Sequence, residues 1–235
     1  MSFSNKKNPS TKLITSVILV LIALVNCTEP SKQGKENFVK IHEVIPNVVY
    51  DIRYYSTDNF VGARVDGYLA PIAFITKEAG IRLNQVQTEI NNEGLGLKIF
   101  DAYRPQKGVD HFVRWGAIPS DTITKAKYYP NINKANVFDL GYVATKSGHS
   151  RGSTLDLTIV DLETKQELDM GSHWDFFGEI SHHESPLVNE QQTTNRNKLR
   201  NIMLKYGFKQ YDNEWWHYTL KEEPFPDTYF DFDVK

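Results

Sequence analysis

The sequence has little cysteine, no excess of charge of one sign and no long hydrophobic run. Its 235 residues include one cysteine, so no internal disulfide supports the fold. The 27 basic and 29 acidic residues leave a net charge of -2, which predicts no nucleic-acid partner. We find no internal repeat and no low-complexity segment. With 40% hydrophobic residues, the chain is expected to fold around an ordinary core.

The longest apolar run, Leu13 to Val25, is short for a membrane-spanning helix, which needs about 20 apolar residues. Lysines precede this run at Lys6, Lys7 and Lys12. A charged start followed by a short apolar core is typical of a secretory signal peptide. We therefore expect residues 1–27 to direct export of the protein.

Cys27 follows the apolar run directly. The stretch Leu24-Val25-Asn26-Cys27 resembles a bacterial lipobox, in which the chain is cut before the cysteine and lipid is attached to its sulfur. Asn26 departs from the Gly, Ala or Ser usual at that position. The resemblance implies a lipid anchor at Cys27 and a periplasmic or cell-envelope location. Residues 28–37 are polar and predict a tether to a folded domain at 38–235.

Helix and strand patterns are interspersed without strict alternation, which favours an α+β fold over a doubly wound parallel sheet. Predicted strands cover 47–54, 97–103, 155–162, 208–211 and 215–220. Predicted helices begin after Thr76 and at Pro105, and a third ends at Gly207. The stretch 118–141 shows little regular pattern, and a loop of that length is often functional.

The first candidate site lies in SGHSRGSTLDLTI, residues 147–159. A strand there turns its leucine and isoleucine side chains to one face and Asp156 to the other. A carboxylate among apolar residues is costly unless a charge or a metal balances it. The alternatives are a strand whose second face is exposed to water and, for His149, an ordinary loop histidine.

EWWHY, residues 214–218, offers a further histidine and a glutamate. Catalytic zinc sites use three protein ligands and leave one position open, whereas structural sites are usually closed by four. His149, Asp156 and His217 supply two imidazoles and one carboxylate. Zinc lowers the pKa of water to about 7, and Glu214 is then free to act as the base. No HExxH motif is present, so a standard zincin is excluded.

Two charged residues fit the same chemistry. FDAYRP, residues 100–105, places Arg104 at the end of a predicted strand, where a fixed positive charge suits an oxyanion. Asp175, in GSHWDFFGE, suits a substrate ammonium. Taken alone, Arg104 is equally consistent with a surface or salt-bridge arginine, and Asp175 with a loop or cap aspartate.

Together these segments resemble the D-alanyl-D-alanine dipeptidase family, the VanX type of zinc peptidase. The resemblance covers nearly the whole chain from about residue 40 onward. Its segments are TDNFVGARVDGY (57–68), FDAYRP (100–105), YYPNI (128–132), GYVATKSGHSRGSTLDLT (141–158), MGSHWDFFGEISHH (170–183), EWWHY (214–218) and PFPDTYFDF (224–232). Gly148 departs from the serine common before the first histidine.

The resemblance implies a fold shared with zinc D,D-carboxypeptidases and the hedgehog signalling domain, a central antiparallel sheet with flanking helices. The implied ligands of one Zn²⁺ are His149, Asp156 and His217. Glu214 is the implied general base, Arg104 the carbonyl and transition-state stabiliser, and Asp175 the group that binds the free amino group of the dipeptide.

The expected reaction is hydrolysis of D-alanyl-D-alanine to two D-alanine. A blocked or longer peptide would leave the Asp175 carboxylate unpaired, which disfavours peptidoglycan stems. Export favours peptidoglycan turnover or salvage over glycopeptide resistance, because the resistance enzymes act in the cytoplasm. The alternatives are a zinc D,D-carboxypeptidase and, less favoured, a lipid-anchored zinc or peptidoglycan-binding module without activity. No protein partner is predicted.

Overall fold

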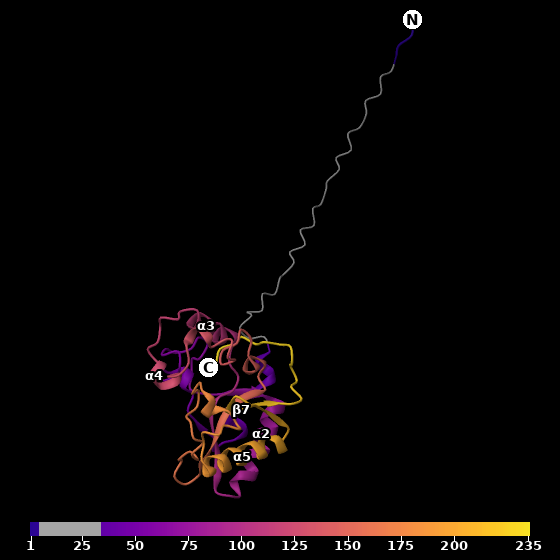
Figure 1. Ribbon diagram of the computed structural model, residues 1–235. Coiled ribbons are helices and arrows are strands. Elements are labelled where there is room, and N and C mark those ends of the chain that lie inside the picture. The colour runs from indigo at the N-terminus through magenta and orange to yellow at the C-terminus, as the bar shows by residue number, and fades with distance from the viewer. Residues whose placement is uncertain (5–33) are drawn as a thin grey trace.

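The computed structural model describes residues 1–4 and 34–235 (Figure 1). The apolar run at 13–25 and Cys27 lie outside the described residues. Within the part of the chain that is described, no helix is both long enough and apolar enough to cross a membrane.

A five-stranded sheet forms the centre of the fold, with the strand order β2-β4-β5-β7-β6. The strands are β2 (Val49–Tyr50), β4 (Leu95–Asp101), β5 (Thr154–Asp161), β6 (Phe208–Tyr211) and β7 (Glu214–Leu220). Neighbouring strands are antiparallel, except that β2 runs parallel to β4. The α+β class is confirmed, and the sheet is antiparallel apart from this short edge.

β5 is the middle strand of the sheet, and both of its faces are buried. On one face of the strand, Leu155 is 0% exposed. On the opposite face, Asp156 is 2% exposed and Thr158 is 0% exposed. A strand with a water-exposed second face is therefore ruled out. Other segments cover that face, among them the loop of Trp174, whose indole reaches the Asp156 carboxylate.

Three longer helices accompany the sheet, namely α2 (Lys77–Asn91), α3 (Gln106–Gly116) and α5 (Glu190–Lys205). α2 and α5 lie side by side, and ion pairs join Lys198 to Glu93 and Lys205 to Glu89 (Figure 1). α3 lies toward the other end of the molecule, near the short helix α4 (Lys125–Tyr128) (Figure 1).

The helix α5 begins well before the apolar residues on which the prediction of a helix ending at Gly207 was based. Its N-terminus is set by a capping box, in which the Asn189 side chain accepts from the Gln192 backbone N–H and the Gln192 side chain accepts from that of Asn189, each at 2.9 Å. These reciprocal bonds satisfy two backbone donors that a helix start leaves free. On one side of the first turns, Gln192 and Asn195 donate to Asp169 in the loop that precedes the helix.

The predicted strand over 47–54 is mostly wrong. Only Val49–Tyr50 forms a strand, and a 3-10 turn follows at Arg53–Tyr55. Asp51 and Arg53 pair at 2.9 Å, and Tyr54 turns into the core, where it is 1% exposed. Tertiary packing of Tyr54 thus overrides the β-propensity of the segment.

A second, two-stranded antiparallel sheet is a feature that the sequence patterns did not indicate. It pairs β1 (Phe38–Lys40) with β3 (Phe74–Thr76), and the one-turn helix α1 (Ile41–Val44) follows β1. Phe38 packs edge-on against Tyr103 and Phe232. This aromatic cluster anchors the C-terminal segment beside the end of β4.

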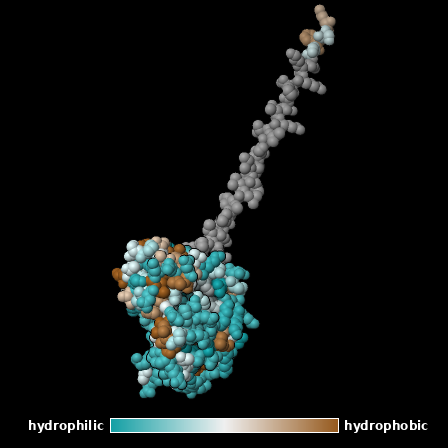
Figure 2. Space-filling view, in the orientation of Figure 1, coloured by the Kyte–Doolittle hydropathy of each residue, from teal (hydrophilic) through white to brown (hydrophobic). Residues whose placement is uncertain are grey.

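The stretch 118–141 is largely irregular, as expected, with α4 and a 3-10 turn at Lys134–Asn136. Lys134 orders it, because its ammonium donates to the Asp121 carbonyl at 2.8 Å and lies 3.9 Å from the centre of the Trp115 ring. The face drawn in Figure 2 is mainly hydrophilic, with hydrophobic residues over the part that carries α3 and α4 in Figure 1 and in smaller spots below it.

His183 gives the fold an expected sensitivity to acid. Burial lowers the pKa of His183 to about 4, and the charges of Arg200 and Arg196 act in the same direction. In the unfolded chain the group binds its proton near pH 6.5. Protonation therefore favours unfolding, and the free energy of unfolding should fall by about 3 kcal/mol between pH 6.5 and pH 4.

Urea unfolding of the zinc-free protein at pH 7 and pH 4 measures this loss. A His183→Gln variant should lose correspondingly less stability over the same pH interval. Equal losses in the two proteins would contradict the assignment to His183.

Candidate active site

His149 lies in a 3-10 turn, Gly148–Arg151, that leads into β5. The Ser147 hydroxyl starts the turn by accepting a hydrogen bond from the His149 backbone N–H at 3.2 Å. Gly152 ends it with φ 87°, a conformation that glycine adopts without strain. His149 Nδ1 lies 2.7 Å from the Ala102 carbonyl oxygen, which can only accept. The proton is therefore on Nδ1, and the Nε2 lone pair is free for a metal.

The sheet register brings the other two predicted ligands together. Asp156 on β5 and His217 on β7 are direct partners across an antiparallel pair, so their side chains leave the same face of the sheet. Asp101 on β4 is the partner of Asp156 on its other side. Residues far apart in the chain thus meet on three adjacent strands.

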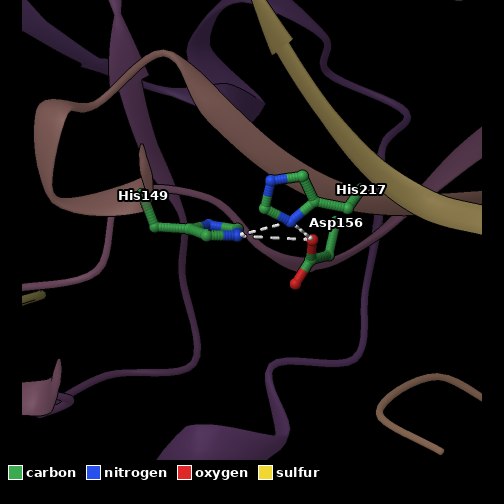
Figure 3. A group of neighbouring side chains, drawn as sticks. All are labelled: His149, Asp156 and His217. Carbon is green, nitrogen blue, oxygen red and sulfur yellow. Dashed lines mark hydrogen bonds and ion pairs between the residues drawn. The ribbon is translucent and has the colours of Figure 1, made fainter. Parts of the chain in front are cut away.

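Figure 3 shows the three side chains converging on one point. His149 Nε2 lies 3.3 Å from Asp156 Oδ1, His217 Nδ1 lies 3.2 Å from the same oxygen, and the two nitrogens are 3.3 Å apart. A tetrahedral zinc ion with bonds of about 2.05 Å separates its ligand atoms by about 3.3 Å. The triangle therefore has the size that a bound zinc ion requires.

The electrostatics of the three side chains also suit a cation. Asp156 Oδ1 is buried and has no hydrogen-bond partner in the described structure, although both imidazoles face it. Burial alone would lower the pKa of His217, but the carboxylates of Asp156 and Glu214 raise it to about 9. A buried orphan oxygen in a negative environment is satisfied by a metal ion, and histidine with carboxylate is a donor set that zinc accepts.

Glu214, the first residue of β7, lies beside this triangle. Its Oε2 atom is 3.3 Å from His217 Nδ1. The β6–β7 register shifts between Gln210 and Tyr211, so that Tyr211 comes opposite Glu214. The Glu214 carboxylate thus lies next to one metal-ligating atom and lines the same cavity as the metal triangle.

Arg104 follows the end of β4 and is held by Asp101. Its Nε and Nη2 atoms lie 3.0 and 2.9 Å from Asp101 Oδ2, and Asp101 also accepts from the Tyr68 hydroxyl at 2.6 Å. The guanidinium lies 5.1 and 5.0 Å from the ring centres of Tyr54 and Phe112. The ion pair with Asp101 and the two aromatic rings fix the position of the guanidinium. Because an arginine side chain stays protonated, this is a fixed positive charge.

Asp175 is buried, with 6% of its surface exposed, and has φ 62°, which is uncommon for a residue with a side chain. Its Oδ2 atom accepts a hydrogen bond from the Tyr54 hydroxyl at 2.7 Å. Burial raises the pKa of Asp175 well above its usual range, and the charge of Asp156 adds to the effect. A cation at this position would take the place of the proton and stabilise the ionised carboxylate.

All six predicted site residues line one cavity of about 260 Å³. The rest of the lining is largely apolar or aromatic, and includes Tyr54, Phe60, Val109, Phe112, Tyr142, Val143, Phe177 and Tyr211. The cavity thus combines the three candidate metal ligands, the Glu214 carboxylate and the Arg104 guanidinium with apolar walls. It fits a small ligand that carries both charged groups and short apolar side chains.

The structure brings together His149, Asp156, His217, Glu214, Arg104 and Asp175, and their individual roles stay predictions. Sequence reasoning missed Tyr54, which holds Asp175, and Asp101, which holds Arg104. It also missed Trp174, whose indole N–H donates to Asp156 Oδ2 at 3.2 Å. Asp101 and Trp174 lie in motifs already singled out, Asp101 three residues before Arg104 and Trp174 directly before Asp175. Tyr54 had no such signal.

Comparison with known proteins identifies the family. Residues 34–235 match the model of the D-ala-D-ala dipeptidase family. The chain belongs to this family. A D-alanyl-D-alanine dipeptidase of Streptomyces coelicolor is 48% identical over 198 residues, which cover 84% of this chain and 98% of that protein. The Enterococcus faecalis enzyme of the same name is 45% identical over 200 residues, covering 85% and 99%.

One solved structure is also similar to this member of the dipeptidase family. It is a mutant of the vancomycin-resistance D,D-pentapeptidase VanY in complex with Zn(II), with 14% identity and a TM-score of 0.41. The match covers 66% of this chain and 76% of that one.

Zinc is expected to stabilise the folded chain. The metal triangle exists only when β5 and β7 are paired, so the ion binds the folded state. At a zinc concentration 100 times the dissociation constant, the gain is about 2.7 kcal/mol, or roughly 5–10 °C in Tm. Thermal unfolding with zinc and with a chelator measures it. The shift should be absent in Asp156→Asn, and an equal Tm with and without zinc in the native protein would contradict the site.

Proposed function

We propose that this chain hydrolyses D-alanyl-D-alanine to two molecules of D-alanine, using one Zn²⁺ per chain. The observation that carries the proposal is the buried Asp175 carboxylate in the wall of the cavity that also holds the metal triad and Glu214. A site for an ammonium thus lies next to a site for peptide cleavage. Membership of the dipeptidase family and the names of the relatives support the same substrate.

His149 Nε2, Asp156 Oδ1 and His217 Nδ1 would hold the zinc ion. When bound, zinc polarises the scissile carbonyl and makes water acidic enough to attack at neutral pH. His149 is kept in the required tautomer by the Ala102 carbonyl. The Asp156 carboxylate keeps one oxygen for the metal because Trp174 occupies the other.

Glu214 acts as the general base and then as the general acid. Its carboxylate takes a proton from the attacking water as the new C–O bond forms. It then delivers that proton to the nitrogen of the leaving D-alanine as the C–N bond breaks, which restores the ionised carboxylate. Its place beside His217 Nδ1, at 3.3 Å, puts it next to the point where water attacks.

Arg104 stabilises the negative charge that develops on the scissile carbonyl oxygen. Its guanidinium is already fixed by Asp101 and by the rings of Tyr54 and Phe112. Little reorganisation is needed at the moment of reaction, because the guanidinium is already oriented by these contacts.

Asp175 binds the free ammonium of the dipeptide, and the Tyr54 hydroxyl orients its carboxylate. A substrate with an acylated amino group offers no cation here and leaves a buried carboxylate unpaired. The preference for a dipeptide over a peptidoglycan stem follows from this one contact.

Release of D-alanine from three substrates tests the proposal. Zinc-loaded protein from residue 28 onward is offered D-Ala-D-Ala, its N-acetylated form and a peptidoglycan pentapeptide in parallel. We expect rapid release from the free dipeptide, only residual release from its N-acetylated form, and none from the pentapeptide. Release from the pentapeptide instead would make the protein a wall D,D-carboxypeptidase and would overturn the role of Asp175. Zinc binding without release from any substrate would point to a binding module.

We also propose that the protein is exported and anchored by lipid at Cys27, with a tether over 28–37 before the domain at 38–235. The charged start and the apolar run at 13–25 support it. Outside the cytoplasm the enzyme would meet dipeptide released from peptidoglycan, so turnover or salvage is its proposed role.

The anchor is tested by fractionating cells that produce the native protein or Cys27→Ser. The native protein should partition with membranes, and the variant should be recovered in the fraction without membranes. Identical partitioning of the two proteins would rule out a lipid at Cys27.

A further inference from the structure

Arg196 on α5 is a buried arginine with no part in the proposed reaction. It is 1% exposed, and burial lowers its pKa to about 10, so it is charged at neutral pH. Its guanidinium donates to three backbone carbonyls, those of Met170, Ile180 and His182, each at 2.7 Å. Burying a charge without an ionic partner is costly, and these three charge-assisted hydrogen bonds offset part of that cost while they fix the positions of the carbonyls.

The three carbonyls lie at the two ends of one loop. Met170 is at its start, and Ile180 and His182 are at its end. Only the planar fork of a guanidinium carries enough donors in fixed directions to reach both ends together. Arg196 therefore closes the loop 170–182 across its base.

The neighbours of Arg196 on α5 hold the same loop. The Asn195 side chain donates to the Asp169 carbonyl at 2.8 Å, and the Gln192 side chain donates to the Asp169 carboxylate at 2.9 Å. The first turns of α5 thus serve as the base on which the loop rests. This explains why the face of α5 toward the loop is polar and yet largely buried.

The loop carries Asp175 in a conformation that it would not hold alone. The φ of 62° at Asp175 is uncommon for a residue with a side chain, and contacts with its surroundings help to hold it. Within the loop, Trp174 is tied to Asp156 Oδ2 and Asp175 is tied to the Tyr54 hydroxyl. With its base open, the loop would be free to relax away from the cavity wall.

We propose that Arg196 is a positioning residue that holds Asp175 in place for the substrate ammonium by closing the loop 170–182 at its base. The proposal rests on the proposed function, because it gives Asp175 the role of binding the ammonium. It adds a residue that touches neither substrate nor metal, and that acts only through backbone carbonyls of the loop.

The test compares Arg196→Lys and Arg196→Gln with Arg200→Lys. Arg200 lies one turn further along α5, but its guanidinium pairs with the exposed carboxylate of Glu184 at 2.5 Å. At saturating zinc, both Arg196 variants should raise KM for D-Ala-D-Ala by roughly 10- to 100-fold, with a smaller change in kcat, since misplacement by about 1 Å has effects of this size. Arg200→Lys should leave KM within twofold.

A double-mutant cycle separates positioning from general destabilisation. If Arg196 acts through Asp175, Arg196→Lys should change kcat/KM by less than twofold in an Asp175→Asn background. The same fold-loss in both backgrounds would overturn the proposal.

Hydrogen exchange measured by mass spectrometry gives a readout that needs no activity. Exchange over 170–182 should rise in Arg196→Lys and Arg196→Gln but not in Arg200→Lys. Unchanged exchange there would overturn the proposal. A native protein without dipeptide turnover would instead overturn the proposed function, and the exchange result would still report whether Arg196 closes the loop.

Discussion

Replacement of Glu214 by glutamine should lower kcat for D-Ala-D-Ala by roughly 10²–10⁴-fold, the usual effect of losing a general acid–base group. Glutamine keeps the size of the side chain but cannot accept the proton of water. The three metal ligand atoms, His149 Nε2, Asp156 Oδ1 and His217 Nδ1, are untouched by the change. Zinc affinity should therefore stay close to that of the native protein, and KM should change little.

Steady-state kinetics and zinc titration of the same samples measure these two expectations. Glu222→Gln is the matched control, because Glu222 is an exposed glutamate just beyond the end of β7. It should leave kcat within twofold. Native turnover in Glu214→Gln would remove Glu214 from the mechanism, and a large loss of zinc would reassign it as a ligand.

The metal ligands could be predicted from the sequence because each lies in a short motif whose local pattern is strong. The alternation of the β5 segment places Asp156 opposite its apolar neighbours, and EWWHY puts Glu214 and His217 near each other on one strand. Their meeting depends on the β5–β7 register, which no local pattern specifies. It was the resemblance to a family that supplied this long-range information.

The residues that hold the site in shape could not be predicted in this way. Tyr54 was assigned to a strand, yet it lies in a turn and its hydroxyl meets Asp175, distant in the chain. Arg196 lies in a helix of polar residues, where a single sequence gives no sign of burial. Their roles arise from tertiary contacts, whereas propensity and periodicity report only on neighbours along the chain.

The elements of the fold likewise divide into those that local sequence predicts and those that depend on distant partners. The starts of long periodic helices such as α2 and α3 are predictable to within one residue, because the apolar spacing, the capping threonine and the proline are local signals. Short elements that depend on pairing with distant partners, such as β1 and β3, left no local signal. The parallel pairing of β2 with β4 also depends on a distant partner, because Val49 and Tyr50 pair with Lys98 and Ile99.

Asp175→Asn should remove the preference for a free amino group. Losing one partner of a buried charge pair costs about 2–5 kcal/mol, so kcat/KM for D-Ala-D-Ala should fall by roughly 30-fold to several thousand-fold. The N-acetylated dipeptide makes no ion pair with Asp175, and its kcat/KM should not fall. Measuring both substrates on the native protein and the variant gives the ratio directly. An equal loss for both substrates would show that Asp175 supports the fold rather than the ammonium.

The pH dependence of the same reaction should carry the signature of Asp175. Burial raises the pKa of its carboxyl well above the usual range. The ionised form binds the ammonium, so kcat/KM for the free dipeptide should fall as the pH drops through this raised pKa, at a higher pH than an exposed aspartate would show. In Asp175→Asn the acid limb should move to lower pH, because asparagine does not titrate. An acid limb at the same pH in both proteins would assign it to another group. The preference for dipeptides would then have to come from the shape of the cavity rather than from charge.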